Sequence, residues 1–350
     1  MHNLQLTEDQ DIVVDTVRKF VADVVGPATL DADEHRQPVA QQFAALAELG
    51  VFGLLVAEAN GGAGMGAVPF VAALESVGAA NTSLARLWIE QAQCAAALEA
   101  AGGKDLDAIV GGANLAVFVG AEHGVRCANG RLTGAAAIVP GGGAADRVLV
   151  AARDGETVVL AEVAGAAVRR SGLRALGLNS ASCARVEFVD TAATVLATGA
   201  GAAAAIARAE FVARIGTAAA AVGSGQASIA AAKKHAGERI AFGKPLLVQE
   251  AVQRKLVESR RQVDAARQLV FHAARTADLG LDSVEATLQA RIAAVDAMVL
   301  AADEAIQIHG GFGYTVEYHV ERHYRDGKML EVLDGGAETM RDQLARRQFA

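Results

Sequence analysis

The stretch QIHGGFGYTVEYHVERHYRD, residues 307–326, is the most informative part of this 350-residue chain. It starts inside a helical pattern, and the pair Gly310 and Gly311 predicts that the helix ends there, because glycine is preferred just past a helix C-terminus. Without Cβ atoms, this backbone also lets a ligand approach closely. The charged run at its end, RHYRD, predicts ion pairs between helices.

Long helical patterns surround this stretch. Three alanine-rich segments, at residues 202–239, 248–280 and 283–311, each predict one long helix, and a short last helix is expected after Asp334. Long helices joined by short loops are typical of antiparallel bundles. Residues 199–350 are therefore predicted to form a C-terminal four-helix-bundle domain.

The middle of the chain has a different pattern. Residues 112–198 contain short β-type runs separated by Gly, Pro and Asp-Gly signals. Such runs predict strands, here in a small antiparallel sandwich or barrel. The segment is short for a domain of this kind, so a shortened middle β-domain is expected.

The first part, residues 1–111, is predicted to be an N-terminal helical domain. Thr7 is placed to cap the first helix, and Pro27 is expected to end it. Further helices are expected around residues 67–80 and 82–101. The fold class is thus mainly α with a small β-domain between two helical domains.

The composition excludes several classes of function. The net charge is −8 and only 4% of residues are aromatic, which argues against nucleic-acid binding. No apolar run reaches the ~18–20 residues of a membrane span, and the acidic N-terminal stretch predicts no secretory signal. Cys94, Cys127 and Cys183 are far apart in the sequence, so no metal site and a cytoplasmic location are expected.

Four strings, taken in order, resemble the acyl-CoA dehydrogenase family. They are LAELGVFGLLVAEANGGAGMG (46–66), LRALGLNSASCARVEFVD (173–190), RIAFGKPLLVQEAVQRKL (239–256) and the stretch at 307–326. The resemblance implies the three-domain fold, usually as a tetramer. It also implies FAD, an acyl-CoA substrate and an electron-transfer flavoprotein as acceptor. In such a reaction a carboxylate removes the proton alpha to the thioester while the beta hydrogen leaves as hydride to the flavin.

The resemblance also implies residues for one half of a cofactor site. In this family one FAD is shared between two subunits, and Arg239 and Phe242 match a segment that serves the neighbour's cofactor. Arg239 would meet the diphosphate, because a guanidinium pairs well with phosphate oxygens. Gln307, Gly310 and Gly311 match a second such segment.

One position of this half-site departs from the family. Glu250 stands where the family usually has Gln, and Gln249 lies beside it as the candidate cofactor-binding residue. A carboxylate near a diphosphate is repulsive unless it turns away. The flavin-side half departs further: the family's T-E-P-x-x-G-S loop is absent, and GAEH keeps one glutamate, Glu122. This chain is therefore not expected to cover a flavin ring by itself.

Asp334 matches the position of the family's catalytic base, commonly a Glu. It is one methylene shorter, which moves the carboxylate by roughly 1.5 Å and matters when geometry is tight. The alternative is a helix cap, with Glu338 favouring the positive end of the last helix. A subset of the family carries its base just before an arginine on the first bundle helix, and here Ala213 precedes Arg214.

Three hypotheses remain open. In the first, the chain is one subunit of a heteromeric α2β2 acyl-CoA dehydrogenase and completes the FAD site of a catalytic partner, with a bulky substrate such as a steroid side-chain thioester. In the second, it is a self-sufficient homotetrameric dehydrogenase that uses Asp334. In the third, it is a structural or CoA-binding relative without flavin.

Overall fold

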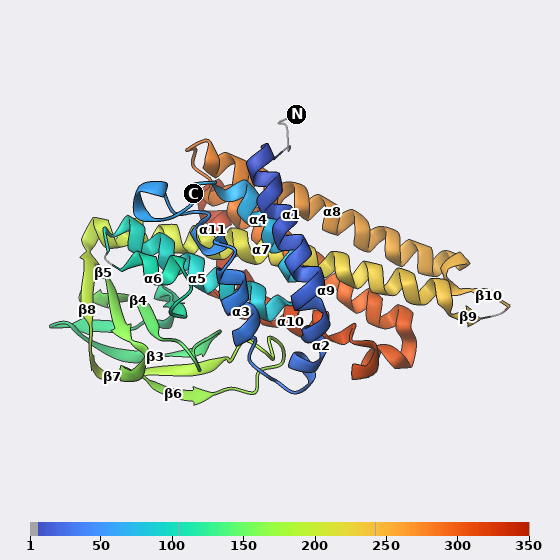
Figure 1. Cartoon of the computed structure of the whole chain (residues 1–350), viewed down its shortest axis with the longest axis horizontal. Helices are drawn as coiled ribbons and strands as arrows, with labels where there is room; N and C mark the ends of the chain where they lie inside the picture. Colours follow the sequence, from blue (N-terminus) through green and yellow to red (C-terminus); the bar gives the residue numbers. More distant parts are fainter. Residues whose placement is uncertain (1–5, 104, 242, 350) are drawn as a thin grey trace.

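The computed structural model describes residues 6–103, 105–241 and 243–349. A β-sheet lies at one end of the molecule and long helices extend from it to the other end (Figure 1). Helices come before and after the sheet in the chain, which confirms the predicted fold class. The domain boundaries after residues 111 and 198 stay predictions.

The N-terminal part begins with a capped helix. The Thr7 hydroxyl accepts a hydrogen bond from the N–H of Gln10, and the Gln10 side chain accepts one from the N–H of Thr7, so the predicted cap is confirmed. The predicted stop at Pro27 is wrong. Pro27 lies in the first turn of the next helix, and the backbone stays helical through it from the preceding π-helical turn. The helices are α1 (Glu8–Phe20), continued by a π-helical turn (Val21–Val25), α2 (Gly26–Glu34), α3 (Ala40–Ala47), α4 (Ala67–Ala80), α5 (Thr82–Ala100) and α6 (Leu106–Val110).

The middle part is one eight-stranded sheet with the order β6-β7-β3-β2-β4-β5-β8, and β1 pairs with β4. Most pairs are antiparallel as predicted, but β4 runs parallel to both β1 and β2, so the sheet is mixed. A parallel partner has to be reached by a crossover, which short-range turn signals do not encode. The strands are β1 (Ala116–Val119), β2 (Arg126–Ala128), β3 (Arg131–Val139), β4 (Arg147–Asp154), β5 (Thr157–Ala164), β6 (Arg169–Gly172), β7 (Ala184–Ala192) and β8 (Thr194–Thr198).

The C-terminal part contains the predicted long helices. Helix α7 has 40 residues and runs through the length of the molecule (Figure 1). A further helix, α10, follows the glycine-rich stretch and had no counterpart among the predicted helices. The elements are α7 (Gly199–Glu238), the hairpin β9 (Ile240–Ala241) and β10 (Lys244–Pro245), α8 (Glu250–Asp278), α9 (Val284–His309), the 3-10 turns η7 (Gly310–Tyr314) and η8 (Val316–Tyr318), α10 (Glu321–Val332) and α11 (Gly336–Phe349).

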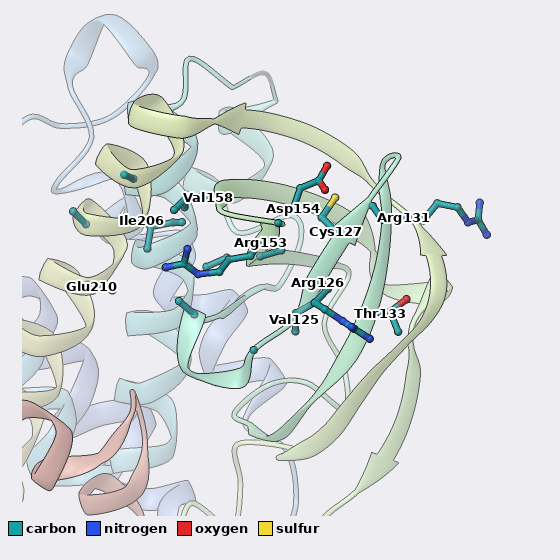
Figure 2. Close-up of a pocket in the computed structure, with 18 residues that line it drawn as sticks. Val125, Arg126, Cys127, Arg131, Thr133, Arg153, Asp154, Val158, Ile206 and Glu210 are labelled. Carbon is teal, nitrogen blue, oxygen red and sulfur yellow. The ribbon is translucent and has the colours of Figure 1, made fainter.

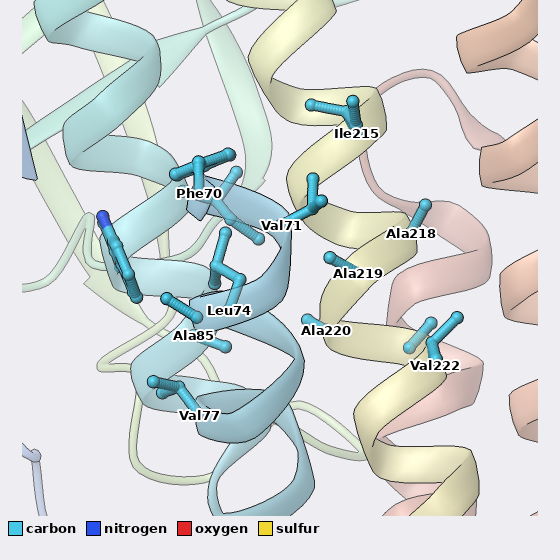
Figure 3. Close-up of a cluster of buried hydrophobic side chains, with 14 of the residues drawn as sticks. Phe70, Val71, Leu74, Val77, Ala85, Ile215, Ala218, Ala219, Ala220 and Val222 are labelled. Carbon is cyan, nitrogen blue, oxygen red and sulfur yellow. The ribbon is translucent and has the colours of Figure 1, made fainter. Parts of the chain in front are cut away.

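The main core lies where α4 and α5 pack on α7. Large side chains of α4 such as Phe70 and Leu74 face small ones of α7, among them Ala219 and Ala220 (Figure 3). Because small residues let helix axes approach closely, α4 and α5 both pack tightly on the middle of α7. Within the described residues, we find no helix with the length and apolar character needed to cross a membrane.

Candidate functional site

Asp334 lies in the turn between α10 and α11, where its backbone has a left-handed φ of +58°. Its carboxylate accepts two hydrogen bonds from the guanidinium of Arg86 on α5, at 2.8 Å (Nη1 to Oδ2) and 2.7 Å (Nη2 to Oδ1). The side chain of Arg86 is 3% exposed and that of Asp334 is 14% exposed. Such two-point ion pairs hold both groups in a fixed orientation.

Arg86 has further partners inside the molecule. Its Nη2 and Nε donate to Glu90 Oε1, one turn along α5, at 2.6 and 3.0 Å. Its Nη1 also donates to the hydroxyl of Thr217 on α7 at 3.1 Å. The other oxygen of Glu90 accepts from the N–H of Phe118 on β1. The cluster thus joins α5, α7, the sheet and the Asp334 turn.

The charges in this cluster are strongly coupled. Burial opposes ionisation of Asp334, but the attraction and hydrogen bonds of Arg86 outweigh it, so the pKa of Asp334 is lowered. Burial raises the pKa of Glu90, and Arg86 offsets this effect only in part. Burial also disfavours the charged form of Arg86, yet its two carboxylate neighbours raise its pKa. One cation is therefore shared by two acids, and Asp334 is the more firmly ionised.

Arg291 on α9 brings a second positive charge to this region. Its side chain is fully buried, and its Nη2 donates to the carbonyl oxygen of Leu330 on α10. Burial lowers the pKa of Arg291 to about 10, although Asp334 acts in the opposite direction. Arg291 thus adds a second positive charge that acts on Asp334, and it lowers the pKa of that carboxylate in the same direction as Arg86.

This geometry bears on both sequence interpretations of Asp334. The carboxylate does not cap α11, which begins at Gly336; its oxygens accept from Arg86 instead. The base role stays a prediction, and the ion pair with Arg86 opposes it because it lowers the pKa of this carboxylate. At the other family position, Ala213 is buried, and Arg214 pairs with Glu210 at 2.7 Å.

A cavity of about 650 Å³ lies beside Asp334. Charged side chains enter it from several elements: Glu122 from the 3-10 turn η4 (Ala121–His123), Arg153 from β4, Glu210 and Arg214 from α7, and Arg346 from α11. Phe118 is the one aromatic residue among those described in its lining. The walls of this cavity are therefore polar and mixed in charge.

Glu122 has no arginine or lysine partner among the described residues. Its carboxylate folds back over Gly120, where a Cβ would overlap it, and His123 Nε2 lies 3.5 Å from Oε1. Burial raises the pKa of Glu122, its own backbone N–H lowers it, and the charges of Asp334 and Glu210 raise it further. The retained glutamate of the GAEH segment thus lines the cavity.

A second cavity of about 690 Å³ adjoins the first and shares Ala121, Arg153 and Glu210 with it. It lies between the sheet and the start of α7. Figure 2 shows Arg153 directed toward α7, whereas Arg126 and Arg131 point away from it across the sheet. Most of the remaining lining is small and apolar. The three shared residues therefore lie at the boundary between the two cavities.

The residues predicted to bind the cofactor gather elsewhere, at the far end of the bundle. Arg239 follows α7, Gln249 precedes α8, and Gln307 lies in the last turn of α9 before Gly310. From Arg214 to Arg239 there are 25 residues along α7, which is roughly 37 Å at the helical rise. The structure therefore separates Asp334 from the predicted FAD residues. Phe242 lies outside the described residues.

This bundle end is open to solvent. Arg239 and Gln307 are exposed, and a Cβ at Gly310 or Gly311 would meet no atom of the described residues within 4 Å. Apolar side chains in the segments that follow Arg239 and Gln307 in the sequence are also exposed: Ile240, Val248, Phe312, Tyr314, Val316 and Tyr318. We call these six residues the bundle-end patch. Apolar clusters of this kind mark surfaces that contact a partner or ligand.

The other charged candidates have structural partners. Arg325 pairs with Asp33 and Glu321, as predicted for the RHYRD run. His323 is buried, and its Nδ1 lies 2.7 Å from the hydroxyl of Ser224. The described parts of the chain contain no group of three or more His, Cys, Asp or Glu residues arranged to hold a metal ion.

Sequence reasoning missed Arg86 and Glu90. Both lie on an otherwise largely apolar helix, and an acid four residues after an arginine there is a detectable signal. Their contact with Asp334 was not detectable, since it joins residues 248 positions apart.

Comparisons with known proteins agree with this architecture. Two family models match, the N-terminal domain of acyl-CoA dehydrogenase at residues 7–108 and its C-terminal domain at residues 199–349. The probable acyl-CoA dehydrogenase YngJ of Bacillus subtilis (strain 168) is 28% identical over 99% of both chains. Butyryl-CoA dehydrogenase from Megasphaera elsdenii has the same fold, with a TM-score of 0.90, 24% identity and 99% of each chain covered.

A chain in the structure of the electron transferring flavoprotein of Acidaminococcus fermentans aligns with a TM-score of 0.92 at 25% identity, over 99% of each chain. Members of this family and fold bind FAD, which confirms the predicted cofactor for the family. The two matched domains, in the predicted order on either side of the sheet, show that this chain belongs to the acyl-CoA dehydrogenase family.

Proposed function

We propose that this chain is one subunit of an FAD-dependent acyl-CoA dehydrogenase, and that the end of its bundle completes the FAD site of a neighbouring catalytic subunit. The observation that carries the proposal is the buried ion pair between Arg86 and Asp334. A general base must lie within hydrogen-bond reach of the proton that it removes, and it becomes a weaker base when a partner stabilises its charge. Here both oxygens of the carboxylate at the base position accept hydrogen bonds from Arg86.

Freeing Asp334 would be costly. A thioester that approached this carboxylate would have to displace Arg86, which would leave a buried cation short of one partner. Breaking a buried pair in this way costs about 3–5 kcal/mol. We therefore assign Asp334 a structural role in this chain and place the working carboxylate in the partner.

The cavity beside Asp334 does not fit a flavin ring. The isoalloxazine is flat and largely apolar, and cofactor pockets are lined mainly by apolar and aromatic groups. This cavity has charged side chains from η4, β4, α7 and α11, including Glu122, for which His123 is the only ion-pair partner among the described residues. The three-residue turn η4 also stands where the family has its longer flavin-covering loop.

The bundle end, in contrast, fits the nucleotide half of FAD. Arg239 offers a charged donor for the diphosphate, and Gln307 offers an amide. At Gly310 the backbone is unobstructed, and Gln249 lies just before α8. Bound FAD would supply the hydride acceptor of the reaction. Because roughly 37 Å separates this end from the Asp334 region along α7, the cofactor contacted here belongs to another subunit's cavity.

The chemistry proposed for the assembly is α,β-dehydrogenation of an acyl-CoA thioester, with an electron-transfer flavoprotein as acceptor. A bulky acyl group such as a steroid side chain would suit an α2β2 complex, in which half of the cavities are altered. A cytoplasmic location is part of the same proposal.

Co-expression with a full-length dehydrogenase chain of the same organism tests the proposal. We expect a yellow α2β2 complex, whereas this chain expressed alone should be colourless. In the complex, Arg239→Ala or Gln307→Ala should lower the FAD content measured by flavin absorbance. Lys234→Ala, an exposed substitution on the same helix, is the control. A yellow homotetramer of this chain, with one FAD per subunit and activity on acyl-CoA, would refute the proposal.

A further inference from the structure

We propose that His235 is a second binding residue for the FAD diphosphate at the bundle end, and that its imidazole takes up a proton when the diphosphate binds. This inference rests on the proposed function, because it needs a cofactor from a neighbouring subunit at Arg239. It adds a residue that the motif comparison did not identify, and it predicts a pH dependence for cofactor binding.

The position of His235 is fixed by aromatic contacts. Its ring stacks on that of His309, with centroids 4.2 Å apart and planes at 25°. Tyr318 of η8 meets the His235 ring edge-on at 5.7 Å. His309 is itself buried, and its Nδ1 lies 2.7 Å from the carbonyl oxygen of Ala305, to which it can donate. The His235 ring is thus held in place without a charged partner.

The same stack brings the predicted FAD residues together. His235 lies in the last turn of α7, four residues before Arg239, so both project from one side of the chain. His309 lies between Gln307 and Gly310 at the end of α9. Contact between the two rings therefore places the end of α7 beside the open glycine backbone. Arg239 follows His235 by about one helical turn, so the two side chains would hold the diphosphate together.

The charges around His235 decide its protonation. Glu238 lies on the same helix and Arg239 directly follows it; α9 contributes His309. The neighbouring β10 carries Lys244, and Lys255 of α8 is paired with Glu304 of α9. Tyr318 of η8 adds a neutral ring. Burial, followed by His309 and Arg239, lowers the pKa of His235, and Glu238 opposes this in part. The free chain therefore carries a neutral imidazole near pH 7.

A bound diphosphate changes this balance. Its negative charges favour the imidazolium, and the carbonyl groups at the C-terminus of α7 favour a cation there as well. The pKa of His235 is then higher in the bound state than in the free state. Affinity for FAD is consequently greatest at low pH and declines as the pH rises through the bound-state value. If the pKa of His235 differs by one unit between the free and the bound state, the affinity for FAD changes by about tenfold over the pH range.

The test measures FAD dissociation from the assembled complex between pH 5.5 and 8.5, using flavin fluorescence as the readout. We expect about tenfold tighter binding at the acid end for the unsubstituted complex. His235→Phe keeps an aromatic ring but cannot titrate, and should give a flat profile. His235→Gln should also be flat, and Lys234→Ala should retain the slope. Thermal unfolding of each variant establishes that the fold is intact.

Two results would overturn the inference. The first is an unchanged pH slope in both His235 variants while Arg239→Ala still lowers FAD binding, since the half-site would then be correct and His235 irrelevant. The second is an Arg239→Ala complex that binds FAD normally at every pH. In that case the diphosphate does not lie at the bundle end, and both the proposed function and the role of His235 are wrong.

Discussion

At the scale of single residues, the pair formed by Arg86 and Asp334 makes the sharpest prediction. Asp334→Asn preserves the shape of the side chain but removes the charge that faces Arg86. Among the described residues, Arg86 then pairs with Glu90 alone. We expect a loss of about 3 kcal/mol in the free energy of unfolding, the lower end of the range for broken buried pairs. Urea denaturation measures this loss.

Asp296 provides a matched control. It also pairs with an arginine, Arg341, but the two side chains are 48% and 41% exposed. Exposed pairs contribute about 0–1 kcal/mol, so Asp296→Asn should change stability little. Equal losses for the two variants would show that burial of the Arg86 pair is unimportant.

The same residue gives a pH dependence. The pKa of Asp334 is lower in the folded chain than the ordinary aspartate value of about 3.9, so its ionisation stabilises the fold above that pH. This contribution is lost as the pH falls through the folded-state value. The stability difference between the unsubstituted chain and Asp334→Asn should thus be constant from about pH 5 to 7 and shrink below about pH 4. A difference that grew in acid would contradict the assignment.

At the scale of elements, the sequence predicted those helix ends that depend on neighbouring residues. The cap at Thr7 and the end of α9 at Gly310 depend on neighbouring residues, and both are found. Pro27 was misinterpreted because proline ends one helix or begins the next equally well from the sequence. The parallel pairing of β1 with β4 depends on distant register, which no local signal carries.

Helix packing supplies the element-scale prediction. A Cβ at Gly223 on α7 would overlap the carbonyl oxygen of Glu75 on α4, so Gly223→Ala should push the two helices apart. We expect a loss of about 1–3 kcal/mol, the usual cost of overpacking. Gly237, on the same helix, has open space at its Cβ position, and Gly237→Ala should stabilise the chain by about 0.5–1 kcal/mol. Calorimetric unfolding temperatures compare the two, and a stabilising Gly223→Ala would contradict close contact.

At the scale of the whole molecule, sequence motifs name candidate site residues but do not give their arrangement. Asp334 and Arg239 were both recognisable from motifs, yet their separation along α7 follows from the length of that helix. The role of Asp334 depends on Arg86, whose side chain comes from the N-terminal helices. Motif matching aligns residues with a family, but buried charge pairing across domains is a property of the packed chain.

The bundle-end patch leads to the last prediction, which concerns assembly. Tyr314 is 80% exposed in the single chain, so Tyr314→Asp should change its unfolding free energy by no more than about 0.5 kcal/mol. In the α2β2 complex the same substitution would bury a charge at the subunit contact, which is strongly unfavourable. We therefore expect normal folding but loss of the complex in size-exclusion chromatography with light scattering. Val189→Asp, at an exposed position of the sheet, should assemble normally. An intact, yellow complex containing Tyr314→Asp would mean that the bundle end remains in solvent, and it would remove the structural reason for an FAD half-site there.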